Sequence, residues 1–145
     1  MGMAVLRRRA ALGLLAVFAA SLLMLGGCGS DKASYTQIDQ DEAVRMMQEE
    51  SDYLIVDVRR PDEFAEKHIK GAINVPNETI EDEAPDALPD KDQLLLIYCR
   101  SGNRSKEASQ KLADMGYTKV YEFGGINTWE GETETGDQSD DGQSE

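Results

Sequence analysis

The stretch LLLIYCRSGNRS, residues 94–105, decides the fold and points to the chemistry of this chain. Its apolar first half predicts a buried strand that leads into Cys99, and a helical pattern begins at Ser105. Such a strand delivers a thiol into a polar loop at a helix N-terminus. Free N–H groups, the helix dipole and nearby arginines lower the pKa of a thiol there, which favours a reactive thiolate. A buried core cysteine is the alternative, and the polar, cationic flanks count against it.

The loop itself is the candidate active site. Its nucleophile is Cys99, and its predicted substrate-binding residues are Arg100, Ser101, Gly102, Asn103 and Arg104. The spacing is Cys-x4-Arg, one residue shorter than the Cys-x5-Arg loop of phosphatases, because position 105 holds serine. A shorter loop encloses less space around the cysteine. It therefore accommodates a terminal sulfur bonded to the cysteine better than a tetrahedral phosphate. A persulfide on Cys99 is therefore the main hypothesis, and a phosphatase or arsenate reductase using the same thiolate is an alternative.

Strands alternate with helices along the middle of the chain. Apolar or β-branched runs predict strands, Asp39 predicts the start of one helix, and Pro61 predicts the start of another that continues to Gly71. The expected strands span 54–58, 72–75, 94–98 and 120–123, and a third helix spans 105–115. The fold class is therefore α/β, with a mainly parallel sheet covered by helices on both faces. Ligands of such sheets lie beyond the carboxyl ends of the strands, where Cys99 is placed.

The chain resembles the single-domain rhodaneses, a family of sulfurtransferases. The resemblance rests on CRSGNR at 99–104, on DVRRPDEFAEKHIKGAINVP at 57–76 and on FGGI at 123–126 followed by Trp129. It covers about Tyr35 to Glu130. The block at 57–76 also occurs in the rhodanese-related cell-cycle phosphatases. The length of the loop after Cys99 therefore distinguishes a rhodanese from such a phosphatase.

The resemblance implies a rhodanese-like fold, with a sheet of about five strands and helices on both faces. It also implies an enzyme in which Cys99 takes the outer sulfur of an anionic donor such as thiosulfate. The resulting persulfide would pass the sulfur to a thiophilic acceptor, either cyanide or a thiol. No metal or organic cofactor is implied, and a monomer is expected. A non-enzymatic module, in which Cys99 carries sulfur to a partner protein, is a further alternative.

Supporting roles are predicted for Asp57, Arg59 and Ser105. Asp57 and Arg59 follow a buried strand and either pair with each other or brace the loop; in the resembled family they are mostly structural. Of the two loop arginines, one is expected to face the donor and the other to be braced by Glu63 or Asp57. The single histidine, His68, is expected to fix a turn, with a general-base role as the alternative.

The start of the chain is typical of a bacterial lipoprotein signal peptide. Three arginines at 7–9 are followed by an apolar run at 10–25 and by LGGC at 25–28. Residues 1–27 are therefore expected to be removed and Cys28 to be lipidated, with palmitate among the acyl chains. The lipid would anchor the protein in the cell membrane on the extracytoplasmic side. An uncleaved N-terminal anchor is the alternative.

The expected organisation has four parts. A signal peptide at 1–27 is followed by a tether at 28–34, by the rhodanese domain at 35–130 and by an acidic tail at 131–145. The tail contains no large apolar residue and is expected to be disordered, because it cannot bury enough surface to offset the entropy of ordering.

The net charge of the chain limits the classes of partner that it is expected to bind. It has 28 Asp and Glu against 15 Lys and Arg, a net charge of −13 at pH 7, and removal of three signal arginines makes it more negative. This excess argues against nucleic acid and against anionic lipid headgroups as partners, so that membrane attachment depends on the lipid. With one His and two Cys, a zinc site is not supported. Lipidation of Cys28 leaves Cys99 as the lone thiol.

Overall fold

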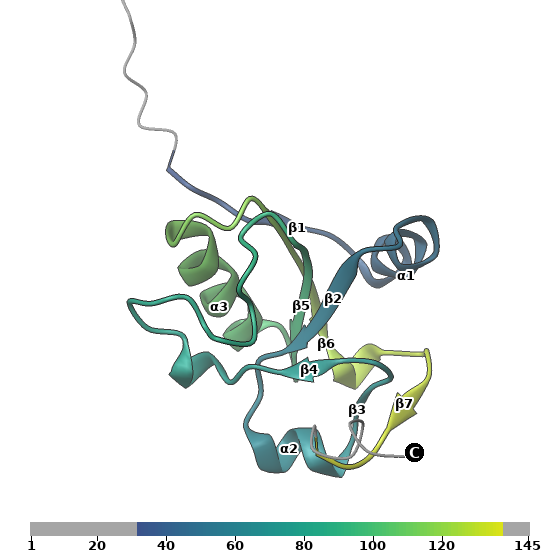
Figure 1. Ribbon diagram of the computed structural model, residues 1–145. Coiled ribbons are helices and arrows are strands. Elements are labelled where there is room, and N and C mark those ends of the chain that lie inside the picture. The colour runs from purple at the N-terminus through teal and green to yellow at the C-terminus, as the bar shows by residue number, and fades with distance from the viewer. Residues whose placement is uncertain (1–31, 138–145) are drawn as a thin grey trace, which may run out of the picture. The chain divides into compact units, whose positions relative to one another are not determined.

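The computed structural model describes residues 32–137 (Figure 1). The predicted signal peptide, Cys28 and residues 138–145 lie outside this part of the chain. In chain order the elements are β1 (Thr36–Gln37), α1 (Gln40–Glu49), β2 (Tyr53–Asp57), α2 (Pro61–Glu66), β3 (His68–Ile69), β4 (Ile73–Asn74), η1 (Asn77–Thr79), β5 (Leu94–Cys99), α3 (Asn103–Asp114), β6 (Lys119–Gly125), η2 (Ile126–Thr128) and β7 (Thr133–Glu134).

Five strands form one parallel sheet in the order β1-β6-β5-β2-β4. Parallel neighbours need crossover connections. Helix α2 lies in the connection from β2 to β4, and α3 connects β5 to β6. The central strand, β5, is buried along its whole length. Its sequence is therefore continuously apolar, without the alternation of a half-exposed strand. The predicted α/β fold with a mainly parallel sheet of about five strands is confirmed.

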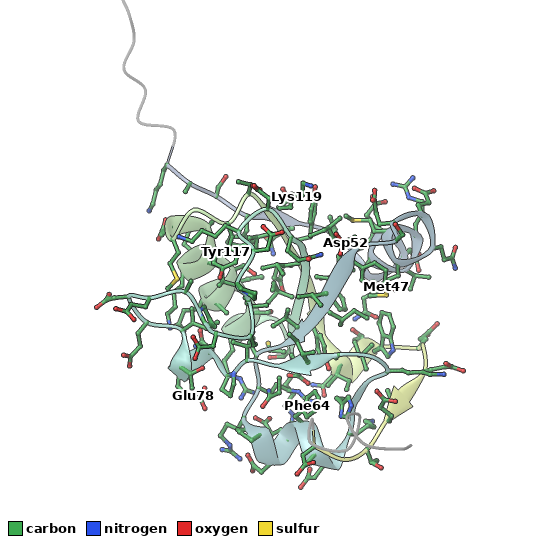
Figure 2. All side chains as sticks on the ribbon, in the orientation of Figure 1. Met47, Asp52, Phe64, Glu78, Tyr117 and Lys119 are labelled. Carbon is green, nitrogen blue, oxygen red and sulfur yellow. The ribbon has the colours of Figure 1, made fainter. Side chains whose placement is uncertain are left out.

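Helices cover both faces of the sheet, with α3 on one face and α1 and α2 on the other (Figure 1). In Figure 2, Tyr117 lies on the α3 side and Met47 on the α1 side. Successive side chains of a strand point to opposite faces, so β5 contributes to both cores. Leu95, Ile97 and Cys99 belong to the core under α3, whereas Leu94, Leu96 and Tyr98 belong to the core under α1 and α2. The sheet thus delivers Cys99 to the α3 face.

Two predicted helix starts are confirmed. The side chain of Asp39 accepts a hydrogen bond from Glu42 N–H at 2.8 Å, which satisfies one of the free donors at the start of α1. Helix α2 begins at Pro61, a residue that the first helical turn tolerates because it lacks an N–H. Both starts could be predicted because the residues that form them are local in sequence.

The end of α2 was predicted wrongly. The helix ends at Glu66 rather than at Gly71, because Lys67 adopts an extended conformation and the next two residues form β3. Strand β3 pairs in antiparallel fashion with β7, more than sixty residues later. The helical spacing of Phe64 and His68 suggested a longer helix, and only the distant partner strand overrides it.

The predicted tail boundary also needs correction. Residues 131–137 are not structureless, because Thr133–Glu134 forms β7. The Glu134 carboxylate accepts Gly71 N–H at 2.8 Å, and Lys70 forms an ion pair with Glu132 at 2.8 Å. The folded domain therefore extends past the predicted end at residue 130. Within residues 32–137, no helix is long and apolar enough to cross a membrane.

Candidate active site

Cys99 is the last residue of β5, at the carboxyl edge of the sheet. The pairing of β5 with β6 shifts between Ile97 and Cys99, so that Cys99 lies opposite Gly125. Only 1% of Cys99 is exposed. The cysteine is therefore as buried as a core residue, yet the loop that follows it lines the sulfur with polar groups.

The loop after Cys99 forms a cradle for the sulfur. Gly102 N–H donates a hydrogen bond to Cys99 Sγ at 3.0 Å. Gly102 has φ of +105°, in the left-handed region that side chains disfavour. This turn leads directly into α3, which begins at Asn103, two residues earlier than predicted. The side chains of Ser101 and Asn103 are exposed.

Opposing effects set the ionisation of the Cys99 thiol. Burial raises its pKa, because a low-dielectric surrounding disfavours the charged form. Hydrogen bonds to the sulfur lower it; they come from the hydroxyl and N–H of Ser105 and from the N–H groups of Gly102 and Ser101. Their combined effect prevails, and the pKa of Cys99 lies below its ordinary value. The cradle thus favours the thiolate, which is the nucleophilic form.

The two loop arginines have different surroundings. Arg104 makes two hydrogen bonds to the Glu63 carboxylate, of 2.7 Å and 3.0 Å, and this bidentate pair ties α3 to α2. Arg100 is exposed, and its guanidinium has no ion-pair or hydrogen-bond partner among residues 32–137. The expectation that an acid braces one loop arginine is confirmed: the arginine is Arg104 and the acid is Glu63.

Comparison with known proteins identifies the family. Residues 39–132 match the Rhodanese-like domain. The chain belongs to the rhodanese-like family. It is 38% identical over 71 residues to the thiosulfate sulfurtransferase PspE of Escherichia coli, which is 49% of this chain and 68% of that protein. It is 33% identical over 104 residues to the thiosulfate sulfurtransferase GlpE of Coxiella burnetii, which is 71% of this chain and 94% of that protein. This rhodanese is accordingly a sulfurtransferase.

A solved structure described as rhodanese with anions from E. coli has the same fold. Its TM-score is 0.53 at 33% identity, over 58% of this chain and 99% of that chain. The predicted rhodanese-like fold is thereby confirmed by an independent comparison.

A buried carboxylate lies behind the cradle of this rhodanese. Glu122 in β6 is only 2% exposed, and its Oε1 accepts the hydroxyl of Ser105 at 2.6 Å. Ser105, for which a supporting role is predicted, is fully buried. Glu122 was not predicted from the sequence, although an acidic residue between Val120 and Phe123 in a buried strand is a signal for a polar role.

Gly125 sets how close β6 comes to the loop. A Cβ atom on Gly125 would lie 2.1 Å from the Arg100 carbonyl oxygen and 2.6 Å from Ser101 N. Asn127 N–H donates to the same Arg100 carbonyl at 3.2 Å. No side chain fits at position 125, so a glycine there is a condition for the cradle of the rhodanese.

Asp57 and Arg59 pair with each other. Arg59 Nη2 lies 2.6 Å from Asp57 Oδ2 and also donates to the carbonyl of Lys67 at 2.6 Å. Both side chains are buried, and the Arg59 guanidinium lies over the ring of Tyr98, 5.9 Å from its centre. Of the two predicted alternatives, the structure therefore supports mutual pairing, next to the strand that carries Cys99.

His68 has a structural environment. Its ring stacks on Phe64 with centroids 3.7 Å apart, and its Nδ1 lies 2.9 Å from the Phe64 carbonyl oxygen. Its Nε2 lies 3.4 Å from Glu134 Oε1. These contacts connect α2, β3 and β7, which agrees with the expected structural role and not with a base beside Cys99.

A cavity of about 340 Å³ adjoins the loop. It is lined by Arg59, Glu63, Glu66, Lys67, Arg100, Ile126, Asn127 and Trp129. Two of the cationic side chains, Lys67 and Arg100, form no ion pair within residues 32–137, and Glu66 lines the same cavity. Within residues 32–137 no group of three His, Cys, Asp or Glu side chains is placed to hold a metal ion.

The Glu63–Arg104 pair predicts how stability depends on pH. Hydrogen bonding from Arg104 is the main reason that the pKa of Glu63 falls to about 2. The pair therefore stabilises the fold at pH values above the ordinary carboxyl pKa of 4.5, and this contribution is lost as pH falls towards about 2. Glu63→Gln is expected to cost about 1.5–3 kcal/mol near pH 7 and progressively less below pH 4.5.

Urea unfolding of both proteins between pH 7 and pH 2 measures this difference. Asp62→Asn is the matched control on the same helix, because the Asp62–Arg60 pair is exposed and contributes little. A difference between wild type and Glu63→Gln that stays constant over the whole pH range would contradict the assignment.

Proposed function

We propose that this sulfurtransferase takes its sulfur from thiosulfate, or a closely similar anionic donor, and passes it from Cys99 to a thiol. The observation that carries the proposal is the hydrogen bond from Gly102 N–H to Cys99 Sγ at 3.0 Å, inside a Cys-x4-Arg loop. Two relatives named thiosulfate sulfurtransferase support the choice of donor. The short cradle and the 1% exposure of Cys99 favour a slim terminal sulfur over a phosphate with its four oxygens.

The reaction has two balanced steps. In the first, the Cys99 thiolate attacks the outer sulfur of thiosulfate, a sulfur–sulfur bond forms on Cys99, and sulfite leaves with the electron pair of the broken bond. In the second, an acceptor thiolate or cyanide attacks the outer sulfur of the persulfide, and the Cys99 thiolate leaves. The N–H groups of the cradle stabilise the negative charge in the persulfide as well as in the thiolate. No base is required, because the low pKa of the thiol supplies the nucleophile.

Arg100 is the best candidate for contact with the anionic donor. It directly follows Cys99 and lines the cavity beside the loop, and its guanidinium has no hydrogen-bond or ion-pair partner within residues 32–137. Arg104 is engaged with Glu63 on two of its nitrogens and is suited to hold the loop in shape. The proposal therefore assigns recognition of the donor to Arg100 and support of the cradle to Arg104.

The first test is a persulfide on Cys99. Thiosulfate is expected to add one sulfur atom to the intact protein, because the outer sulfur of the donor remains bonded to Cys99 after sulfite leaves. Mass spectrometry under reductant-free conditions measures the change, and cyanide should reverse it with release of thiocyanate. Cys99→Ser is the control and should show neither event. An unchanged wild-type mass, or robust aryl phosphatase activity that depends on Cys99, would contradict sulfur transfer.

The second test concerns the charge of Arg100. Arg100→Glu is expected to raise the KM for thiosulfate about 10- to 100-fold, since a charge-assisted contact contributes about 1.5–3 kcal/mol. Steady-state kinetics with thiosulfate and cyanide measure the change. The matched control is Lys106→Glu, which makes the same charge change at an exposed position of α3. An equal rise in KM in both variants would show a general effect of net charge and no contact by Arg100.

We further propose that lipid on Cys28 holds this domain at the outer side of the cell membrane. The support is the sequence LGGC at 25–28 after an apolar run with an arginine-rich start. The net charge of −13 gives no attraction to anionic headgroups, so the acyl chains must supply the attachment.

Labelled fatty acid tests the anchor. The wild type is expected to carry label at Cys28 and to fractionate with membranes, because two or three acyl chains bind firmly at about 0.8 kcal/mol per buried methylene. Cys28→Ala is expected to lose the label, and the protein is then either released or retained as an uncleaved precursor. Wild-type protein without label, or a Cys28→Ala protein of unaltered mature mass, would contradict the proposal.

A further inference from the structure

Arg59 is a buried arginine whose guanidinium is only partly used by the protein. Its Nε and Nη2 donate to the Asp57 carboxylate, and Nη2 also donates to the Lys67 carbonyl at 2.6 Å. These contacts occupy three of the five guanidinium N–H groups. Nη1 forms no hydrogen bond within residues 32–137, although only 5% of Arg59 is exposed. Buried N–H groups are normally paired, so those on Nη1 are available to a ligand.

The cavity next to the loop is where a ligand can reach this arginine. Arg59 lines the cavity of about 340 Å³ together with the side chains of Ile126 and Trp129. Cavities of about 300–1,000 Å³ are typical of sites for organic molecules, whereas thiosulfate and cyanide would fill only a small part of this one. The wall formed by Ile126 and Trp129 suits a carbon skeleton, and Nη1 of Arg59 suits an oxygen acceptor on that skeleton.

The charges around the cavity favour an anionic group on such a molecule. Arg100 and Lys67 form no ion pair within residues 32–137. Of the two acids in the lining, Glu63 is neutralised by its pair with Arg104. Glu66 is exposed, so water and salt screen its repulsion. A carboxylate therefore suits the unused guanidinium nitrogen better than a neutral oxygen does.

We propose that Arg59 is a specificity-determining residue for the acceptor: its Nη1 binds the carboxylate of a low-molecular-weight thiol that collects the sulfur from Cys99. The proposal rests on the sulfur transfer proposed above. The acceptor thiolate attacks the outer sulfur of the persulfide, a new sulfur–sulfur bond forms, and the electron pair of the broken bond returns to Cys99. The bound carboxylate holds this thiolate next to the loop, which raises its effective concentration.

Acceptor kinetics of Arg59→Lys test the proposal. Lysine keeps a cation for Asp57 but has no further nitrogen for a ligand. The probe is β-mercaptopropionate, and β-mercaptopropionamide is its uncharged counterpart of nearly the same size; the two are compared at equal thiolate concentration. The KM of the acid is expected to rise about 10-fold in the variant and that of the amide less than about threefold, because only the acid loses a charge-assisted hydrogen bond.

Arg60→Lys is the matched control. It makes the same change at the next residue, whose side chain is exposed, pairs with Asp62 and does not line the cavity. Neither KM should change in this variant. An equal rise for acid and amide in Arg59→Lys would show a structural role alone, and a rise confined to the KM for thiosulfate would assign Arg59 to the donor. Either result overturns the proposal.

Binding to the wild-type protein gives a test that depends neither on a variant nor on sulfur transfer. Trp129 is the one tryptophan of the chain and lines the cavity, so its fluorescence reports occupancy. The thioether β-(methylthio)propionate resembles the acceptor without its thiol. It is expected to change this fluorescence in a saturable way and to shift the guanidinium signals of Arg59 in nitrogen NMR, whereas its amide should do neither. Equal affinity for acid and amide, or unchanged Arg59 signals at saturation, would contradict the role of Arg59.

Failure of the proposed function is recognised separately. If thiosulfate adds no sulfur to Cys99, the proposed sulfur transfer is refuted. The binding measurements still decide whether Arg59 holds a carboxylate, because the thioether cannot accept sulfur as a thiol does.

Discussion

The hydrogen bond from Gly102 N–H to the sulfur of Cys99 is the interaction on which the rest of the site depends. It requires a strand that ends at the sulfur, a backbone at φ of +105° that only glycine adopts readily, and a partner strand without a side chain at Gly125. Each requirement falls on a different element. The parallel sheet brings these elements to one edge. The hydrogen bond to the Cys99 sulfur therefore forms only when the whole sheet is folded.

The sequence predicted those features whose causes are local. Cys99 and the helix that follows it lie within a few residues of one another, and the start of α3 was predicted to within two residues. Asp39 and Pro61 mark helix starts by their own chemistry. Features that depend on distant partners were missed. The end of α2 is decided by β7, and the place of Glu122 becomes visible only when β6 lies beside the loop. Local propensity carries no information about either pairing.

The cationic side chains near the sulfur are of two kinds: some are paired with an acid, and others form no ion pair with a described residue. Arg104 is held by Glu63, and Arg59 by Asp57, so these cations maintain geometry and cannot turn towards a ligand without leaving an unpaired acid. Arg100 and Lys67 border the cavity without such partners. A chain with net charge −13 thus keeps a small positive opening at the point where an anion must approach.

The near-complete burial of Cys99 also has a consequence for oxidation. A disulfide requires the two Cα atoms to approach within about 7 Å, so a cysteine of another folded protein would have to bring its backbone into the cradle. Because only 1% of Cys99 is exposed, that approach is excluded, whereas a small molecule that leads with one atom meets less steric hindrance. The width of an approaching molecule therefore determines whether it can react with the Cys99 thiol. Steric exclusion can preserve an unpaired, readily ionised cysteine where exposed thiols would cross-link.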